Sequence, residues 1–451
     1  MKNTIKQNVK KLENDVIESI SMAVSYPSIL DEDSSTEKMP FGKGIDDCLN
    51  AVLSLCDNLG YRTYKDKNGY YGYAEIGEGD ELVGILGHLD VVPVGDLNAW
   101  NTNPFEAVVI DGKIYGRGTQ DDKGPTIACL YAVKALVNSG VKFNKRIRFI
   151  FGTDEETLWR GIAKYKENNE EIPTMGIAPD SEFFCINAEK GLLQAFLTCD
   201  KSSDLILKAG NAFNSVPDKA IYDAGVSDIS TLKGVLNGLE YEYEEENNKI
   251  CVLGKSVHSA YSDEGINAIS RLAIALRKIG YKSNAIKFIS DVIGEDANAN
   301  NIVENCEDVS GKLTFNVGKL DMDNEKEVIS IDVRIPVTYK KEEVVNAIIE
   351  KASEYGLEYE EFDWLDSSYV SSEHFLIQTL KRVYEEETGL KAIPESSGGA
   401  TYARAIDNCV AYGMVFPHSE KTEHQANEYI TLSDLRKATE LYAISLYELV
   451  N

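Results

Sequence analysis

The order of apolar and polar positions in the first 189 residues predicts alternating strands and helices. Residues 81–92 form an apolar run of strand length, and residues 145–152 place Ile147, Phe149 and Phe151 on one face of a second strand. Residues 121–140 have a helical period that ends at Gly140. Buried parallel strands read as continuous apolar runs, and strands that alternate with helices are typical of a parallel sheet. The pattern therefore predicts an α/β fold with a mostly parallel central sheet.

From about residue 190 the pattern changes. Residues 192–210 and 238–256 alternate apolar and polar positions as antiparallel strands do, and residues 265–280 and 340–356 have a helical period. This part is typical of an α+β unit, and the segment that follows it resumes the character of the first unit. We expect one α/β domain formed by residues 1–189 and 366–451, interrupted by an inserted α+β domain at residues 190–365.

The net charge and the cysteine pattern indicate which binding partners and which cellular compartment to expect. The chain has 46 Lys and Arg against 74 Asp and Glu, a formal net charge of −28. A field of that sign repels nucleic acid and anionic membranes, so we expect neither as a partner. The first 24 residues lack the apolar core of a signal peptide, and the eight cysteines include no C-x-x-C pair. These features predict a cytoplasmic protein with reduced thiols.

Candidate chemistry begins towards the carboxyl end of the first predicted strand, residues 81–92. His88 and Asp90 share a face of the extended chain at the carboxyl end of the strand, where open α/β sheets bind ligands. Other acidic and imidazole groups lie in turns near predicted strand ends, namely Asp121, Asp122, Glu155, Glu156, Asp180 and His424. Taken singly, each has an ordinary structural explanation; Asp122, for example, could cap the following helix.

Taken together, these groups predict a metal site. Carboxylates crowded at one sheet edge repel one another and are stable mainly when cations neutralise them. Two imidazoles with several carboxylates suit zinc, manganese or cobalt. The number of donors is sufficient for two divalent metal ions.

The motifs that carry these residues resemble those of the co-catalytic dizinc metallopeptidases, which include aminoacylase, carnosinase and succinyl-diaminopimelate desuccinylase. The resemblance covers nearly the whole chain and rests on "GHLDVVPVG", "GRGTQDDKGP", "GTDEE", "APDSEF" and "MVFPHSEKTEHQANEYI". Three segments, "PFGKGI", "NSVPDKA" and "TEHQANEYITLSDL", are similar to the peptidase V-like dipeptidases of bacteria in particular.

The resemblance implies a ligand set for two metal ions, with zinc foremost and manganese or cobalt also accepted. Asp121 would bridge both ions. His88 and Asp180 would complete one site, and Glu156 and His424 would complete the other.

The resemblance also implies roles for two carboxylates beside the metals. Asp90 would accept the second ring N–H of His88 and so fix its tautomer. Glu155 would be the general base, which takes a proton from the bridging water and delivers it to the departing amine.

Five further roles follow from the same resemblance. His258, in "GKSVHSAYSDEGINA", would stabilise the oxyanion, although Ser262 stands where the family usually has proline. Asn214 and Arg334 would bind the peptide group and terminal carboxylate of the substrate; the residues alone leave a surface ion pair equally open for Arg334. Gly398 and Gly399 would let the backbone approach the substrate closely.

The function implied is a metal-dependent dipeptidase for short unblocked peptides, in which the inserted domain is a lid over a catalytic domain. Because the lid is long, we expect it to cover its own active site and the protein to be a monomer. The alternatives are an N-acyl amino acid deacylase on the same metal centre and a non-catalytic peptide-binding relative. A carbohydrate or phosphate hydrolase would leave the two histidines unexplained.

Overall fold

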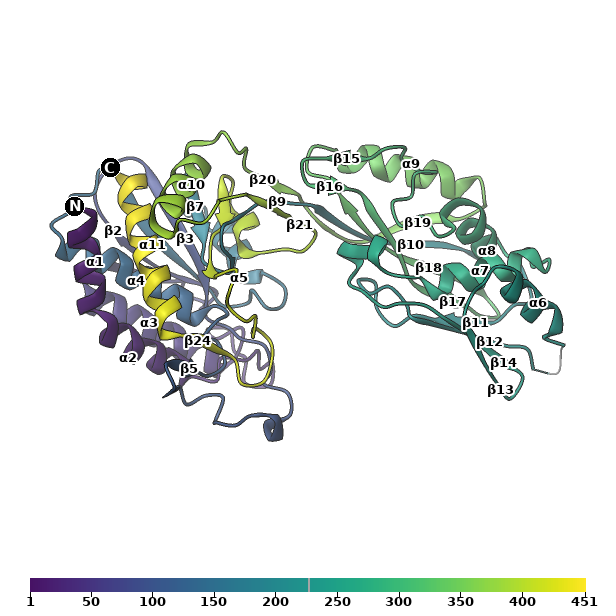
Figure 1. Ribbon diagram of the computed structural model, residues 1–451, viewed down its shortest axis with the longest axis horizontal. Coiled ribbons are helices and arrows are strands. Elements are labelled where there is room, and N and C mark those ends of the chain that lie inside the picture. Colours follow the sequence, from purple (N-terminus) through teal and green to yellow (C-terminus); the bar gives the residue numbers. More distant parts are fainter. Residues whose placement is uncertain (226–227) are drawn as a thin grey trace. The chain divides into compact units, whose positions relative to one another are not determined.

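The computed structural model describes residues 1–225 and 228–451, and the chain divides into two compact units (Figure 1). Unit 1 comprises Met1–Asn187, Val370–Glu395 and Thr401–Asn451, and unit 2 comprises Ala188–Tyr369 and Ser396–Ala400. Unit 2 thus begins and ends within a few residues of the segment expected as the inserted domain, 190–365.

The short segment Ser396–Ala400 is a difference from the sequence-based division, because it belongs to unit 2 although the main part of unit 2 ends before it. The predicted glycine pair, Gly398 and Gly399, therefore lies in unit 2, whereas the sequence-based boundaries put it in the second part of the catalytic domain.

The main sheet of unit 1 has a parallel centre with antiparallel flanks. Its strand order is β1-β2-β6-β3-β7-β22-β9. The pairs β6–β3, β3–β7 and β7–β22 are parallel, whereas β1–β2, β2–β6 and β22–β9 are antiparallel. The α/β class is confirmed, with parallel pairing confined to the four central strands. The bounds are β1 Arg62–Lys65, β2 Gly72–Ile76, β3 Leu82–His88, β6 Arg146–Gly152, β7 Met175–Ala178, β9 Ile186–Glu189 and β22 Cys409–Ala411.

Strand β3 occupies the middle of the parallel region, and every one of its residues is buried. This explains the uninterrupted apolar run in the sequence, because a strand covered on both faces needs no polar alternation. Gly87 is required by packing, since a Cβ atom there would lie 1.9 Å from Oγ1 of Thr126 on helix α4. The close approach of α4 fixes the end of β3, where His88 lies.

Helices cover the sheet and complete the core of unit 1. Helices α1, α4 and α11 pack against one another, as Figure 1 shows. The helices of unit 1 are α1 Lys2–Lys11, α2 Glu13–Val24, α3 Lys43–Leu59, α4 Lys123–Asn138, α5 Arg160–Glu167, α10 Phe375–Thr388 and α11 Leu432–Val450. Among the helices of residues 1–225 and 228–451, none combines the length and apolar character that crossing a bilayer requires.

Two small sheets of unit 1 lie outside the main one. The sheet β4-β5-β24 joins β4 Val108–Ile110, β5 Lys113–Tyr115 and β24 Tyr429–Thr431. The second pairs β8 Ser181–Glu182 with β23 Met414–Val415. The β5–β24 pairing brings together segments that are more than 300 residues apart in the chain.

Unit 2 has the α+β composition that the sequence predicts. Its main sheet, β11-β17-β18-β10-β19, is antiparallel, and helices α7, α8 and α9 pack against it. Along β10, Leu193, Ala195 and Leu197 are buried and alternate with more exposed residues, so one face of the sheet forms the core with the helices.

The helices of unit 2 are α6 Ser230–Gly238, α7 Ala268–Lys278, α8 Asn284–Phe288 and α9 Lys341–Ser353. Its strands are β10 Gly191–Asp200, β11 Leu207–Ala209, β12 Lys219–Asp223, β13 Tyr243–Glu246, β14 Lys249–Leu253, β15 Glu307–Asp308, β16 Gly311–Lys312, β17 Thr314–Met322, β18 Lys326–Ile335 and β19 Glu358–Leu365. Two further short strands are β20 Ser368–Tyr369 and β21 Glu395–Ser397.

Candidate metal centre

The candidate ligands of unit 1 come from the carboxyl ends of neighbouring strands and from two loops. His88 is the last residue of β3, and Asp180 follows β7 by two residues. Glu156 lies in the loop after β6, Asp121 lies just before α4, and His424 lies in the segment before β24. Parallel strands point their carboxyl ends to the same edge, which explains why residues far apart in the chain meet here.

These five residues form two groups that share Asp121. The potential ligand atoms of His88, Asp121 and Asp180 lie within 4.8 Å of one another, and so do those of Asp121, Glu156 and His424. Asp121 lies between the two imidazoles. Its Oδ1 is 3.0 Å from Nε2 of His88 and its Oδ2 is 2.9 Å from Nε2 of His424.

The remaining donors complete each group. Oδ2 of Asp180 lies 3.8 Å from Nε2 of His88, and both carboxylate oxygens of Glu156 lie 3.2 Å from Nε2 of His424. The structure thus brings together all five residues that the resemblance implies as ligands, in the pairing that it implies. No sequence spacing could have given these distances.

Two observations indicate that the groups suit a divalent cation. Nε2 of His88 is buried and, among the described residues, has no partner in hydrogen-bond geometry. A buried ring nitrogen that is not hydrogen-bonded but faces carboxylates is a suitable metal donor. The donor set of two imidazoles and three carboxylates also matches the preference of zinc, manganese and cobalt.

The pKa values of the acidic groups in the cluster also indicate that the site suits a divalent cation. Burial, with the negative charge of Asp121, raises the pKa of Asp180 well above its usual value. Burial also raises the pKa of Glu155 to about 8, helped by the charges of Asp90 and Glu156. Asp121 is the exception: burial opposes its charge, but the adjacent imidazoles of His424 and His88 keep its pKa low. Buried carboxylates crowded in this way favour a neutralising partner, which a divalent cation supplies.

Asp90 contacts His88 in a different way from the one expected. Nδ1 of His88 is 3.0 Å from the backbone carbonyl oxygen of Asp90 and 3.6 Å from its carboxylate Oδ1. The nearer partner is therefore the carbonyl group, which orients the ring equally well. The other carboxylate oxygen of Asp90 accepts the backbone N–H of Glu156 at 3.0 Å, so this side chain also holds a second candidate ligand.

Asp122 does not cap helix α4 through its side chain, contrary to the simple structural explanation. Its Oδ2 accepts the backbone N–H of His88 at 3.0 Å and the hydroxyl of Thr126 at 2.8 Å. The side chain points back to the strand because it binds the end of β3 to the first turn of α4. The two adjacent aspartates thus have different roles: Asp121 belongs to the cluster of candidate ligands, and Asp122 supports His88 at the end of β3.

Two buried charged residues near the cluster were not identified from the sequence. The ammonium group of Lys123 donates to the carbonyl oxygens of Ala23 and Tyr26 at the end of α2. Glu428 is fully buried and accepts hydrogen bonds from the loop that carries Asp121. Glu428 lies four residues after His424 in a motif that the sequence did single out, but nothing in that motif reveals its distant partners.

The other candidate residues lie in unit 2, where His258 and Asn214 are neighbours. Ser215 forms a β-bridge with His258, and the carbonyl oxygen of Asn214 accepts the N–H of Ser259 at 3.0 Å. Nδ1 of His258 accepts the N–H of Ala260 at 3.2 Å. In the neutral ring the proton therefore lies on Nε2, which makes that atom a hydrogen-bond donor.

Arg334 is buried, so the explanation as a surface ion pair is wrong. Its Nε and Nη2 donate to the two carboxylate oxygens of Asp332 at 2.6 and 3.0 Å. Nη1 donates to the carbonyl oxygen of Gly398 at 2.7 Å, and Nη2 also donates to Oγ of Ser259. Removing one partner of a buried pair costs about 3–5 kcal/mol, so an Arg334→Ala variant would report lost folding as well as lost binding.

The two glycines differ in what the structure requires of them. A Cβ atom on Gly398 would lie 2.6 Å from Cβ of Ala260, so only glycine fits against the segment that follows His258. A Cβ atom on Gly399 would meet only Oγ of Ser397 at 3.3 Å. The close approach at Gly398 is thus to the chain itself.

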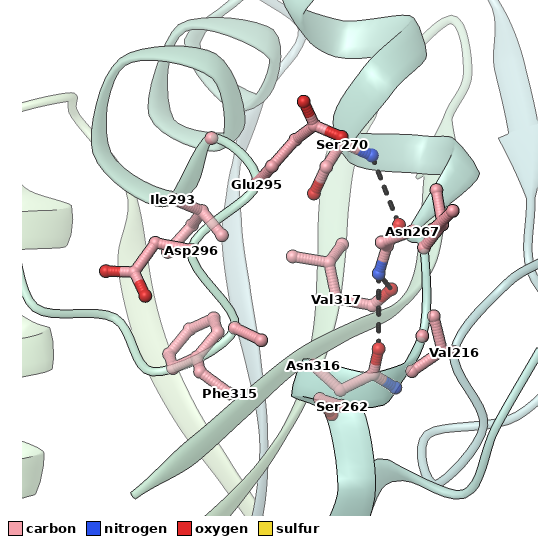
Figure 2. Close-up of a pocket in the computed structure, with 14 residues that line it drawn as sticks. Val216, Ser262, Asn267, Ser270, Ile293, Glu295, Asp296, Phe315, Asn316 and Val317 are labelled. Atoms are coloured by element: carbon pink, nitrogen blue, oxygen red, sulfur yellow. Dashed lines mark hydrogen bonds between the residues drawn. The ribbon is translucent and has the colours of Figure 1, made fainter. Parts of the chain in front are cut away.

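Ser262, where the related family usually has proline, has a clear structural role. Its hydroxyl donates to the carbonyl oxygen of Ser259 at 2.6 Å and closes the turn η2 (Ser259–Glu264). Ser262 also lines a cavity of about 60 Å³ with Asn267, whose amide donates to Asn316 and to the carbonyl oxygen of Val317 (Figure 2). A hydroxyl can therefore hold the loop shape that a proline ring would otherwise impose.

We expect His258 to be uncharged at neutral pH. Burial, and then the charge of Arg334, lower its pKa below the value of 6.5 that it has when unfolded. Its contribution to stability is thus present above pH 6.5 and is lost as the pH falls towards the folded-state pKa. An NMR titration of the ring resonance, assigned by its absence in His258→Gln, should give a midpoint below 6.5. A midpoint at or above 6.5 would contradict this environment.

The fold and the cluster define the class of the protein. Two donor groups that share a carboxylate, at the carboxyl edge of an α/β sheet, are typical of metal-dependent hydrolases. Residues 84–448 match the peptidase family M20/M25/M40, and the chain belongs to this family. The resemblance read from the motifs is confirmed at the level of the family.

Relatives in two bacteria match the whole chain. A protein of Bacillus subtilis (strain 168) named "Putative dipeptidase YtjP" is 36% identical over 462 residues, which cover 98% of each chain. A protein of Staphylococcus aureus (strain USA300), also named as a dipeptidase, is 34% identical over 469 residues, which cover 98% of this chain and 99% of its own.

Solved structures show the same fold at low sequence identity. The aminoacylhistidine dipeptidase from Vibrio alginolyticus has a TM-score of 0.61 and 12% identity, over 96% of both chains. The dipeptidase Dug1p from Saccharomyces cerevisiae has a TM-score of 0.59 and 14% identity, over 99% of this chain and 98% of its own. The fold of this chain is therefore shared with solved peptidase structures.

Proposed function

We propose that the protein is a metal-dependent dipeptidase that hydrolyses short peptides with a free N-terminus. The observation that carries the proposal is the pair of donor groups sharing Asp121, with the carboxylate of Glu155 beside them but outside both groups. Oε2 of Glu155 lies 4.0 Å from Nε2 of His88. The bacterial relatives named as dipeptidases match over their full lengths, which supports the same substrate class.

His88, Asp121 and Asp180 would hold one divalent cation, and Asp121, Glu156 and His424 a second. Zinc is the foremost candidate, with manganese or cobalt accepted by the same donors. The bound cations would supply an activated water and polarise the scissile carbonyl group. Asp90, Asp122 and the close packing of α4 keep the imidazole of His88 in place.

Glu155 would act as the general base and acid. Its burial beside three other carboxylates favours proton uptake, which suits a group that must accept a proton from water. The same carboxyl group would then deliver that proton to the departing amine. In unit 2, His258 would donate from Nε2 to the developing oxyanion, because its Nδ1 is already an acceptor.

The substrate would be bound by residues of unit 2, namely Asn214, Arg334, Gly398 and Gly399. Arg334 differs from the others because most of its donors already have partners within the protein. Its guanidinium group already serves Asp332, Ser259 and the carbonyl oxygen of Gly398. We propose that Arg334 contributes to substrate binding with its remaining Nη1 hydrogen and by shaping the segment around Gly398.

We further propose a cytoplasmic monomer whose inserted domain, at about residues 190–365, closes over its own catalytic domain, at about residues 1–189 and 366–451. A mixing experiment tests the monomer. If His258→Ala and Glu155→Ala variants stay inactive when combined, each active site belongs to one chain. Recovery of activity in the mixture would mean that histidine is supplied by a neighbouring chain.

The substrate class is tested with chelated enzyme resupplied with zinc, manganese or cobalt one at a time. We expect unblocked dipeptides to be hydrolysed with at least a tenfold higher kcat/KM than N-acetyl or N-succinyl amino acids. The reverse ratio would identify the protein as an N-acyl amino acid deacylase. Hydrolysis of neither class, with binding of dipeptides retained, would identify a non-catalytic relative.

A further inference from the structure

Two loops that carry candidate ligands are tied together by a buried carboxylate. One loop, residues 116–121, ends at Asp121, and the other, residues 420–429, contains His424. The carboxylate of Glu428 accepts the backbone N–H groups of Gly118, Gln120 and Asp121 at 3.0, 2.8 and 3.2 Å. It also pairs with the buried guanidinium group of Arg117 at 2.7 Å.

The side chain of Gln120 makes the return connection. Its Oε1 accepts the backbone N–H groups of Thr422 and Glu423 at 2.7 and 3.1 Å. Its Nε2 donates to the carbonyl oxygens of Glu420 and Tyr429 at 3.1 and 3.2 Å. Each loop therefore sends one buried side chain to the backbone of the other, and we call this pair, Gln120 and Glu428, the reciprocal clasp.

The clasp acts directly beside the two ligands. Gln120 precedes Asp121 in the chain, and its acceptor holds the N–H of Glu423, which precedes His424. His424 has φ of +62°, a left-handed conformation that an ordinary residue adopts only when its surroundings hold it there. The result is a distance of 2.9 Å between Oδ2 of Asp121 and Nε2 of His424.

Neither residue of the clasp belongs to a donor group, and both are buried, Gln120 at 7% exposure and Glu428 at 0%. Buried polar groups with every partner in place hold a loop in one conformation, because any movement leaves several of them unsatisfied. The other donor group is anchored differently. His88 is held by β3 and by the side chain of Asp122, and Asp180 follows directly from β7.

We propose that the reciprocal clasp of Gln120 and Glu428 presets the Asp121–Glu156–His424 site and gives it much of its metal affinity. Both are positioning residues, and the proposal rests on the metal centre of the proposed function. Removal of Gln120 should loosen residues 420–423 and therefore His424, whereas Asp121 stays tied by Glu428. The loss should then fall on one ion of the two.

The test is calorimetric titration of zinc into chelated protein, without substrate. In Gln120→Ala we expect one zinc to bind about 10–100-fold more weakly, as is usual when a group that orients a ligand is removed. The other zinc should bind within threefold of the unmodified protein. Gln120→Glu keeps the acceptor for Thr422 and Glu423 but loses the donors, so its zinc affinity should lie between those of Gln120→Ala and the unmodified protein. It replaces Gln120→Ala in the test if that variant does not fold.

Gln425→Ala is the matched control, because Gln425 is exposed and its side-chain amide donates to the nearby carbonyl oxygen of Lys421, within its own loop. Thermal unfolding of the chelated variants separates positioning from general stability. Unchanged affinity at both sites, or an equal loss at both with a lower Tm, would overturn the proposal. If the unmodified protein bound fewer than two zinc ions, the metal centre itself would be wrong. If the protein bound two zinc ions but did not cleave dipeptides, the proposed function would be wrong and the proposal for the reciprocal clasp would still stand.

Discussion

Replacement of Glu155 by glutamine should lower kcat for dipeptide hydrolysis by about 10²–10⁴-fold, the usual contribution of a general base. Glutamine keeps the volume of the side chain but cannot take up a proton from water. Because Glu155 lies outside both donor groups, the zinc content should not change. The measurement is steady-state kinetics on one unblocked dipeptide, together with the metal content of the same preparation.

A matched control separates the chemistry from the substitution itself. Glu167→Gln makes the same change on the exposed end of the nearby helix α5, where Glu167 pairs only with Lys164 among the ion pairs of the described residues. We expect its kcat to equal that of the unmodified enzyme. If the Glu155→Gln variant retains kcat within threefold, Glu155 is not the general base. If the variant loses zinc, Glu155 is a metal ligand and not a base.

KM gives a second reading of the same variant. If Glu155 acts only on the proton in the transition state, kcat and kcat/KM should fall together while KM holds. A rise in KM with little change in kcat would mean that Glu155 binds substrate.

The donor residues could be predicted from the sequence because each follows a local signal. His88 ends an apolar run, Glu156 follows a turn after a second strand pattern, and Asp180 ends a third, whereas Asp121 and His424 lie in turns whose motifs resemble the family. These signals put the side chains at one edge of a sheet, and the structure brings them together there. Their spacing of 3–4 Å depends on packing between strands, which no single segment encodes.

The contacts that hold the candidate site residues in place were not predicted from the sequence, for two different reasons. Glu428 meets partners about 310 residues away, so no local pattern can reveal it. The Asp332–Arg334 pair, by contrast, has a signal that could have been used, because residues two apart on a strand share a face. That spacing already indicates that Asp332 engages Arg334, as the 2.6 Å hydrogen bond shows.

Parallel pairing in the main sheet is centred on β3, where the sequence pattern predicts it. Strand–helix–strand alternation holds for β3, α4 and β6, and these strands do pair in parallel. The flanking strands are antiparallel: β1 pairs with β2, and β2 pairs with β6. Only a short connection separates β1 from β2, as antiparallel neighbours allow. The α/β fold class is therefore confirmed, and the antiparallel flanks lie in segments for which the sequence pattern made no prediction.

Replacement of Asp121 by asparagine should remove both metal ions, because this residue alone belongs to both donor groups of the described residues. Asparagine retains the shape and one oxygen of aspartate but not the negative charge that two adjacent cations require. Activity should fall to the level of chelated enzyme. Addition of zinc, which should raise the Tm of the unmodified protein, should no longer do so.

Single-group variants make this prediction discriminating. Asp180→Asn and Glu156→Gln each remove a donor from one group only, so each should leave one zinc bound per chain, measured by mass spectrometry of dialysed protein. Asp96→Asn, on an exposed loop, is the matched control and should keep two. A content of one zinc in all three site variants would mean that Asp121 serves a single ion. Asp121 would then bind one ion and only contact the imidazole of the other site, from which it lies about 3 Å away.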